Sequence, residues 1–271
     1  MFKYMLDKSY MEKILKVKNY YSKFIIKVKF DTKVIDVIKL MHENHIRNIF
    51  IEKEGKLIGI VTIKEIMKGI EKDPSIVFHN EIMKLAKNLE EIDINETIFK
   101  SARIMYDKDV GILVVKENNK IIGKVGERDL LLSIPYLKIE LRVIDVMSRD
   151  VEYVYPENTI FDALVIMNKR KSRHVPVVEN NRLVGMFSSR DILRIFSKCS
   201  NEEEVRKVIN IQVRKEMKID PLTIDPYAFI VDAANLMVNK NIGALPVIDI
   251  TKIIGIITER DMIKILAQTK I

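Results

Sequence analysis

The sequence LPVIDITKIIGIITERD, residues 245–261, is the stretch from which the fold can be predicted. Two short runs rich in β-branched residues flank a turn and predict a pair of strands. The second run, Ile253 to Ile257, leads straight into Thr258, a residue typical of a helix N-cap. A helix that begins at the end of a strand presents free backbone amides, which favour anions and nucleotides.

The same pattern recurs four times along the chain with constant spacing. In the copy quoted above, Met237 lies nine residues before Pro246, and Gly255 lies nine residues after it. The other copies keep both intervals, with Met167, Pro176 and Gly185, with Met105, Val114 and Gly123, and with Met41, Phe50 and Gly59. Six residues after each glycine there is an acid, at Glu65, Asp129, Asp191 and Asp261. This registry predicts four tandem repeats whose methionines face the core.

Length and composition indicate a compact protein of about two domains. The chain has 271 residues, of which 48% are hydrophobic and 31% are charged, and this length suits four half-domain repeats that pair two by two. No apolar run reaches the length of a membrane span, and the first 18 residues lack the apolar core of a secretory signal. We therefore expect a cytoplasmic protein. The single cysteine, Cys199, excludes an intramolecular disulfide and a multi-cysteine metal site.

The net charge of +8 raises the question of nucleic-acid binding. The lysines are spread along every segment, without the compact basic block and interleaved aromatic residues of a single-strand binder. Abundant Lys, Glu and Ile resembles the surface composition of thermophilic proteins. Nucleic acid is therefore not the expected partner, although a general preference for anionic ligands follows from the charge.

Each repeat is predicted to fold as strand, helix, strand, strand, helix. The predicted first strands are at 24–30, 89–94, 151–155 and 222–224. Pro135 cannot continue the helix that begins near Glu127, so we place the boundary between the two halves there. The predicted organisation is an N-terminal accessory helix over 1–20, a first half over 21–134 and a second half over 135–271.

Three features resemble the cystathionine-β-synthase (CBS) domain, and the resemblance covers nearly the whole chain. They are Asp145-Val146-Met147-Ser148-Arg149-Asp150, Arg173-His174-Val175-Pro176-Val177, and the endings that run from each glycine to its acid. The resemblance implies an α+β fold of four tandem CBS repeats (β-α-β-β-α), paired into two Bateman modules that form a disc, similar to the γ subunit of AMP-activated protein kinase. It also implies clefts that bind adenosyl ligands such as AMP, ADP, ATP or S-adenosylmethionine.

The repeat endings allow a structural and a functional interpretation. Thr258 and Asp261 have the spacing of a helix capping box, which contributes about 0.5–2 kcal/mol. An Asp at this place can also accept hydrogen bonds from both hydroxyls of a ribose, while the free amides and the helix dipole favour phosphate. Charge-assisted bonds of that kind contribute about 1.5–3 kcal/mol each. For a single repeat, the sequence leaves both interpretations open.

Repeats three and four have the endings that best suit a nucleoside. Ser188 with Asp191, and Thr258 with Asp261, combine a hydroxyl with an Asp. The resemblance implies ribose recognition by the two acids and phosphate or backbone-side contacts by the two hydroxyls. It also places Thr223 near the adenine. We expect the second half to bind more tightly than the first.

Repeats one and two depart from this pattern. Repeat two keeps Asp129 but has Gly126 where the hydroxyl should be, so a ribose contact there would come with weaker phosphate fixing. Repeat one has Thr62 followed by Glu65, and Glu at this position suits a capping box better than a ribose diol. The ending of repeat one is interpreted as degenerate.

Basic side chains near the endings are candidates for phosphate binding. Arg190 and Arg260 directly precede the acids of repeats three and four, although each is also typical of a solvated cation at a helix start. Arg173 and His174 match positions where the family places phosphate-binding residues. Arg47 occupies the same place in repeat one.

No nucleophile–base pair, paired carboxylates or Gly-rich phosphate loop stands out, so we expect no catalytic residues and no enzyme activity. His42 and His45 are interpreted as surface residues, and neither a metal site nor a required cofactor is expected. The predicted function is a regulatory sensor that binds an adenine nucleotide or adenosyl compound and signals its occupancy to a protein partner, as a monomer or homodimer. Two alternatives stay open: a nucleic-acid-associated basic protein, and a scaffold with vestigial clefts.

Overall fold

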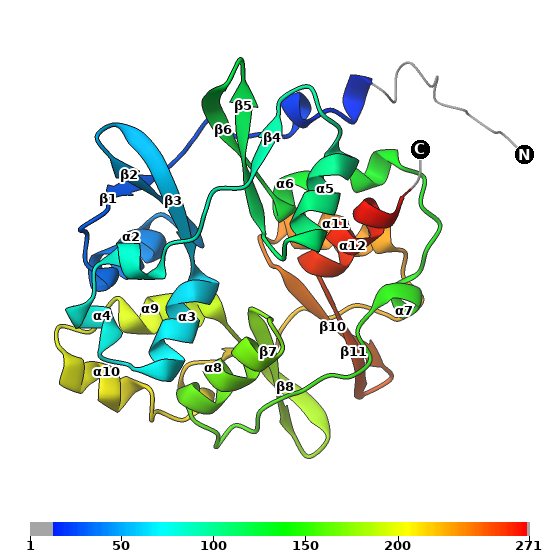
Figure 1. Cartoon of the computed structure of the whole chain (residues 1–271). Coiled ribbons are helices and arrows are strands. Elements are labelled where there is room, and N and C mark those ends of the chain that lie inside the picture. Colours follow the sequence, from blue (N-terminus) through cyan, green and yellow to red (C-terminus); the bar gives the residue numbers. More distant parts are fainter. Residues whose placement is uncertain (1–12, 270–271) are drawn as a thin grey trace, which may run out of the picture.

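Four units surround a common centre in the computed structural model, which describes residues 13–269 (Figure 1). They follow the predicted order of strand, helix, strand, strand and helix. The predicted accessory helix over 1–20 lies mostly outside the described residues. Its described end contains the short 3-10 helix η1, Val17–Asn19.

The bounds of the elements are as follows. Repeat one contains β1 (Lys27–Lys29), α2 (Val34–Glu43), β2 (Asn48–Lys53), β3 (Lys56–Thr62) and α3 (Ile63–Lys72). Repeat two contains β4 (Glu91–Asp93), α5 (Ile98–Asp107), β5 (Ile112–Glu117), β6 (Lys120–Gly126) and α6 (Glu127–Leu131). Repeat three contains α8 (Ile160–Lys169), β7 (His174–Glu179), β8 (Arg182–Ser188) and α9 (Ser189–Phe196). Repeat four contains α11 (Ile230–Asn239), β10 (Ala244–Asp249), β11 (Lys252–Thr258) and α12 (Glu259–Gln268). The connecting segments carry α4 (Ile76–His79), η2 (Ile82–Leu85), η3 (Ile134–Tyr136), α7 (Val143–Val146), α10 (Glu202–Val208), η4 (Val213–Lys215) and β9 (Lys218–Ile219).

All four first strands are shorter than predicted: β1 and β4 have three residues each, and repeats three and four keep only an isolated bridge. In repeat one, β1 pairs in parallel with β2, and the amide of Phe50 donates to a carbonyl of the preceding segment at 3.0 Å. Pro176 and Pro246 occupy the equivalent position in repeats three and four, and proline has no amide hydrogen to donate. The ladder is therefore reduced to one bridge in each of these repeats, at Val154 and at Ile224.

At each glycine of the repeated pattern, a backbone segment of another repeat lies alongside and forms backbone hydrogen bonds; we call this mutual contact between two repeats segment exchange. Ile60, directly after Gly59, exchanges two backbone hydrogen bonds with Lys87 of repeat two, at 3.0 and 2.9 Å. A Cβ atom at Gly59 would lie 3.1 Å from the carbonyl oxygen of Lys87, so the close approach requires glycine. The four equivalent contacts are Gly59 with Lys87, Gly123 with Ser22, Gly185 with Lys218 and Gly255 with Ser148. Repeats one and two thus exchange segments, as do repeats three and four.

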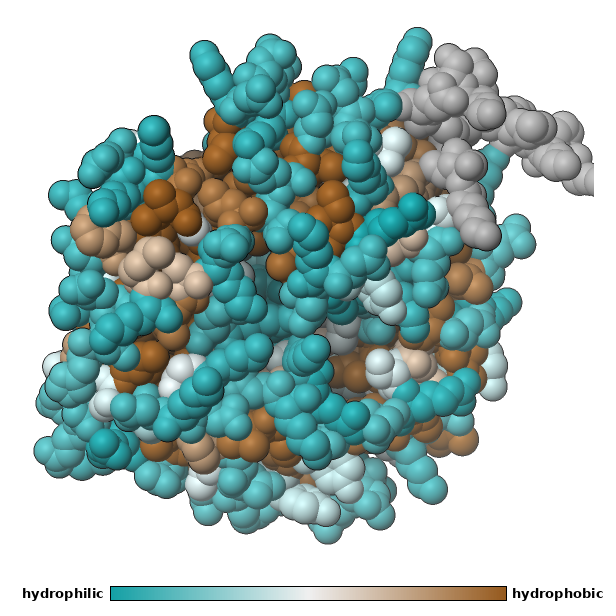
Figure 2. All heavy atoms as spheres, in the orientation of Figure 1, coloured by the Kyte–Doolittle hydropathy of each residue, from teal (hydrophilic) through white to brown (hydrophobic). Residues whose placement is uncertain are grey.

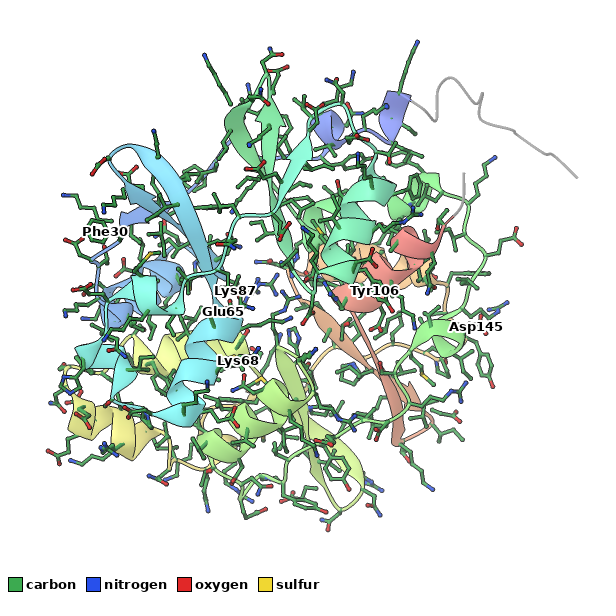
Figure 3. All side chains as sticks on the ribbon, in the orientation of Figure 1. Phe30, Glu65, Lys68, Lys87, Tyr106 and Asp145 are labelled. Carbon is green, nitrogen blue, oxygen red and sulfur yellow. The ribbon has the colours of Figure 1, made fainter. Side chains whose placement is uncertain are left out.

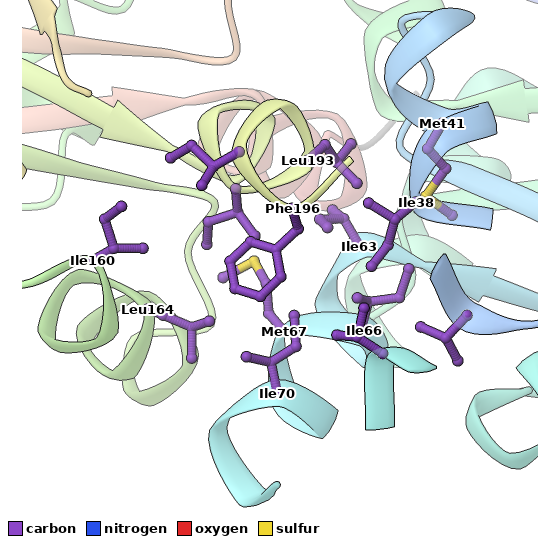
Figure 4. Close-up of a cluster of buried hydrophobic side chains, with 14 of the residues drawn as sticks. Ile38, Met41, Ile63, Ile66, Met67, Ile70, Ile160, Leu164, Leu193 and Phe196 are labelled. Carbon is purple, nitrogen blue, oxygen red and sulfur yellow. The ribbon is translucent and has the colours of Figure 1, made fainter. Parts of the chain in front are cut away.

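The helices connect different pairs of repeats from those joined by segment exchange. One large hydrophobic core joins repeats one and three, and a second joins repeats two and four. Figure 4 shows Met67 and Ile70 of α3 close to Leu164 of α8 and Phe196 of α9. The four methionines of the repeated pattern are completely buried in these two cores, which confirms their predicted packing role. Segment exchange and helix packing together connect all four repeats.

The described surface is largely hydrophilic. The face shown in Figure 2 is hollowed near its centre, where polar side chains gather. Within residues 13–269, no helix is both long and apolar enough to cross a membrane. No group of three or more metal-ligating side chains was found in that range.

Candidate functional site

Each of the four predicted acids lines a cleft. We name each cleft after the repeat that supplies its acid. Cleft four contains Asp261 and has a volume of about 470 Å³, and cleft three contains Asp191 and has about 300 Å³. Cleft two contains Asp129 and has about 150 Å³, and cleft one contains Glu65 and has about 40 Å³. The two largest clefts both belong to the second half of the chain.

The opposite wall of each large cleft comes from the repeat that exchanges segments with the acid's repeat. In cleft four, the wall across from α12 contains Ser148 and Pro176 of repeat three. In cleft three, the wall across from α9 contains Pro221 and Leu222 of repeat four. Neither repeat of the pair forms its cleft alone.

The acids of clefts three and four are held by the predicted hydroxyl residues. The amide and the hydroxyl of Thr258 both donate to Oδ2 of Asp261, each at 2.7 Å. Ser188 makes the same two bonds to Oδ2 of Asp191, at 2.9 and 2.7 Å. Because both bonds fall on one oxygen, Oδ1 of Asp261 keeps its acceptor capacity, whereas Oδ1 of Asp191 also accepts from Arg194 at 3.3 Å and keeps part of it. The capping and ligand-binding interpretations are therefore compatible in these repeats.

Burial changes the acidity of two of these groups. Desolvation raises the pKa of Asp261 above its usual range, although the bonds from Thr258 oppose this effect. Desolvation also raises the pKa of Asp129, against a 2.7 Å bond that Asp129 accepts from the Gly126 amide. A ligand that donates hydrogen bonds would stabilise the charged form of either carboxylate.

Cleft one is closed by its own acid. Glu65 Oε2 accepts from the amide and the hydroxyl of Thr62 at 3.1 and 2.5 Å, and Oε1 lies 3.0 Å from Nζ of Lys87. Figure 3 shows Glu65 and Lys87 close together. The Thr62 hydroxyl also accepts from the Lys64 amide at 3.2 Å. The predicted capping box is confirmed, and the extra methylene of Glu lets its carboxylate fold onto the helix start.

Two buried glutamates at the centre of the molecule were missed by the sequence analysis. Glu259 is fully buried and accepts from Arg47, Arg128 and Arg173 at 3.1, 2.6 and 2.9 Å. Glu127 accepts from Arg173 at 2.7 Å. The predicted phosphate ligand Arg173 thus also bridges both glutamates, while it lines clefts two and four.

An alternation along the repeats could have revealed these glutamates. Repeats one and three have an arginine where repeats two and four have Gly111 and Gly243, and only the latter two begin their last helix with Glu. A Cβ atom at Gly243 would lie 3.1 Å from Oε2 of Glu259, and one at Gly111 would lie 3.3 Å from Cδ of Glu127. The missing side chains make room for the carboxylates, which meet the arginines of the other repeats.

The central charges alter each other's pKa. Burial would raise the pKa of Glu259, but attraction by the surrounding arginines lowers it to about 2. Burial and the neighbouring Arg173 lower the pKa of Arg47 to about 10. Both groups remain charged at neutral pH, so Glu259 and Arg47 form a permanent ion pair.

Arg260 and Arg190 line clefts four and three and also contact other repeats. Arg260 donates to Asp109 at 2.9 Å and to Glu127 at 3.2 Å. Arg190 donates to the backbone and side-chain oxygens of Asn241 at 2.6 and 3.0 Å. Each arginine therefore lines a cleft and at the same time forms hydrogen bonds with another repeat.

His174 and Thr223 differ in their placement. His174 lines both clefts three and four. Burial and then the charges of Arg173 and Arg47 lower its pKa to about 3, so the imidazole is neutral at physiological pH. Thr223 is exposed; its neighbour Leu222 lines cleft three, and Thr223 does not line any of the four clefts described above.

Comparisons with known proteins agree with this architecture. The CBS domain model matches residues 17–72, 81–136, 143–198 and 210–268. The uncharacterised protein MJ1225 of Methanocaldococcus jannaschii is 30% identical over 91% of this chain and 96% of its own length. Its crystal structure, described as that of a candidate archaeal homologue of γ-AMPK, superposes with a TM-score of 0.83 at 25% identity and covers 93% of this chain and 100% of that one.

Two further solved structures are similar to parts or all of the chain. A conserved protein of Pyrococcus horikoshii has a TM-score of 0.64 at 25% identity and covers 93% of this chain and 99% of its own. The CBS pair CBSX2 in complex with AMP covers 47% of this chain and 96% of its own, with a TM-score of 0.41 at 28% identity. The family match covers most of the chain, and the chain belongs to the CBS domain family.

Proposed function

We propose that the protein is a sensor that binds an adenine nucleotide in clefts four and three and signals their occupancy to a protein partner. The observation that carries this proposal is cleft four, where Asp261 shares one cavity of about 470 Å³ with Arg260 and Arg173. The carboxylate suits a ribose diol, and the guanidinium groups suit phosphate. The volume lies within the range of about 300–1,000 Å³ that is typical of small-molecule sites.

Apolar side chains in the same clefts suit a base. Ile166, Pro176 and Ile256 line cleft four, and Met186 and Ile242 line cleft three. Ligand sites commonly combine such apolar walls with a few polar groups that set the orientation. Each of the two clefts contains both parts.

The charges of cleft four favour a nucleotide over S-adenosylmethionine. Six basic and four acidic side chains line this cleft. S-adenosylmethionine carries a positive sulfonium and no phosphate, so AMP, ADP or ATP complements this excess of positive charge better. The description of MJ1225 as a candidate homologue of γ-AMPK also supports a role as a nucleotide sensor.

Isothermal titration calorimetry with AMP, ADP, ATP, S-adenosylmethionine and adenosine tests the proposal. We expect nucleotide binding to wild type and affinity weakened by about tenfold or more in both clefts of the Asp191→Ala, Asp261→Ala double variant. Asp162→Ala is the matched control. The amide and the hydroxyl of Thr159 donate to Oδ2 of Asp162, each at 2.8 Å, at the exposed start of a helix. The control loses a cap without losing a cleft acid.

The alternatives have distinct outcomes. Binding of short DNA that weakens steeply with salt and ignores the double substitution would favour the nucleic-acid interpretation. No binding of any adenosyl compound at millimolar concentration would leave a scaffold with vestigial clefts. Equal nucleotide affinity in wild type and the double variant would remove the assignment to these acids.

A further inference from the structure

One wall of each cleft is formed by the residue that directly follows the glycine of the repeated pattern. That residue is Ile256 in cleft four, Met186 in cleft three and Ile60 in cleft one. In cleft two the same position is Lys124. An ammonium group therefore replaces the apolar side chain at this position, and the apolar lining of cleft two is limited to Ile63 and Ile112.

The volume of cleft two also argues against a nucleoside. The cleft measures about 150 Å³, whereas clefts three and four measure about 300 and 470 Å³. Sites for small organic ligands typically begin at about 300 Å³. Cleft two is about half as large, so it suits a smaller ligand.

Positive charge dominates the lining of cleft two. Its basic side chains are Arg47, Lys64, Lys124, Arg128 and Arg173, and its acidic side chains are Glu127 and Asp129. Behind this lining, Glu259 pairs with the arginines and Asp109 pairs with Lys64, so part of the excess positive charge is offset.

No carboxylate among residues 13–269 forms a salt bridge with Lys124, and the acid that acts on its ammonium group is the nearby Asp129. The Nζ atom of Lys124 donates to the neutral Oδ1 of Asn48 at 3.5 Å. Asp129 instead accepts from the Gly126 amide at 2.7 Å, so its carboxylate is engaged in the helix cap. Cleft two therefore combines a small volume with an ammonium group that can pair with an added anion.

We propose that cleft two binds a small oxyanion without a nucleoside, namely one phosphate group or two linked ones. Lys124 and the arginines supply the charge-assisted hydrogen bonds. Asp129 caps its helix, and its negative charge weakens the binding of the anion. The assignment does not depend on nucleotide binding in clefts three and four. Lys64, Glu127 and Arg173 line both cleft two and cleft four, so the anion would lie beside the phosphate side of the larger cleft.

Isoleucine methyl NMR can observe each cleft separately. Ile63 lines cleft two, Ile256 lines cleft four and Ile242 lines cleft three. Titrations with pyrophosphate, orthophosphate and adenosine, without divalent cations, would be followed at these three methyl groups. We expect pyrophosphate and orthophosphate to shift the Ile63 methyl, and adenosine to leave it unchanged.

Three variants test the roles of the charges. Lys124→Gln should weaken the anion affinity read at Ile63 by about tenfold or more, the loss of one charge-assisted bond. Lys120→Gln removes an exposed lysine from the same strand and should change nothing. Asp129→Asn keeps the shape of the cap but removes the like charge, so anion affinity should rise.

The opposite results would overturn the proposal. An Ile63 methyl that responds to adenosine, together with loss of that response in Asp129→Asn, would make cleft two a nucleoside site. No response to either phosphate at millimolar concentration, or equal affinity in Lys124→Gln and Lys120→Gln, would remove the anion site. Failure of the nucleotide proposal is read separately, at Ile256 and Ile242.

Discussion

The two halves of the chain have the same backbone plan but clefts of different capacity. Clefts three and four measure about 300 and 470 Å³, whereas clefts one and two measure about 40 and 150 Å³. In cleft one, Glu65 folds onto its own helix start and pairs with Lys87. In cleft two, Lys124 replaces an apolar side chain. The comparison teaches that the repeated fold positions the clefts, while a few side chains decide what each cleft can admit.

The central glutamates differ between the halves in a related way. Glu259, from the second half, accepts from three arginines, two of which belong to the first half. Glu127, from the first half, contacts Arg173 and Arg260, both of the second half. The centre therefore joins the halves through ion pairs, with Glu259 as the more heavily paired carboxylate.

The largest effect is expected from Glu259→Gln. Removing this buried charge leaves three arginines facing a neutral group, which should reduce the free energy of unfolding by about 3–5 kcal/mol. Glu127→Gln should cost less because Glu127 has fewer partners. Urea denaturation measures both, with Glu203→Gln as a control, since the exposed Glu203 only pairs with Lys207 at 2.7 Å. Equal losses for the two central variants would contradict the difference between the halves.

The Glu259 carboxylate should also make the free energy of unfolding depend on pH. The pKa of Glu259 is lowered from 4.5 to about 2, so its contribution is complete above about pH 4.5 and is lost as the pH falls toward 2. The difference in stability between wild type and Glu259→Gln should therefore shrink over that range. Asp129 and Asp261, whose raised pKa values act in the opposite sense, are present in both proteins and cancel. A difference that stays constant from pH 6 to about pH 2 would refute the assignment.

An intermediate effect is expected on nucleotide binding. Asp261→Ala should weaken AMP binding in cleft four by about 1.5–3 kcal/mol, the contribution of one charge-assisted hydrogen bond. Glu65→Ala removes the acid at the same position in repeat one and should leave AMP affinity in cleft four unchanged, because Glu65 does not line that cleft. Calorimetry compares the two variants. A loss of similar size in Glu65→Ala would show that the halves do not differ as proposed.

A smaller effect is expected from the two central glycines. A Cβ atom at Gly243 would lie 2.9 Å from Cε1 of the partly buried His174, whereas the nearest atom to one at Gly111 would be 3.3 Å away. Gly243→Ala should therefore destabilise the protein by about 1–3 kcal/mol through overpacking, and Gly111→Ala by less. Thermal unfolding ranks the pair. A Gly111→Ala variant that is the less stable of the two would reverse the ranking.

Much of the fold could be predicted from local sequence signals. The constant spacing of Met, Gly and acid predicted four repeats, and the strand pairs and caps followed from β-branched runs and from Thr258 and Thr62. All four first strands were predicted too long, and in repeats three and four only a single bridge forms. The reason was present in the sequence, since Pro176 and Pro246 remove a ladder hydrogen bond, but it counts only when the partner strand is known.

The four repeats and the position of an acid at the start of each closing helix follow from the sequence alone. These features depend on neighbours a few residues away, through capping, backbone freedom and side-chain periodicity. Only the tertiary structure decided that the helical cores join repeats one with three and two with four, and that Glu127 and Glu259 meet arginines of other repeats. It also decided the volume of each cleft. These outcomes depend on which surfaces far apart in the chain are buried together, a choice that amphipathic patterning leaves open.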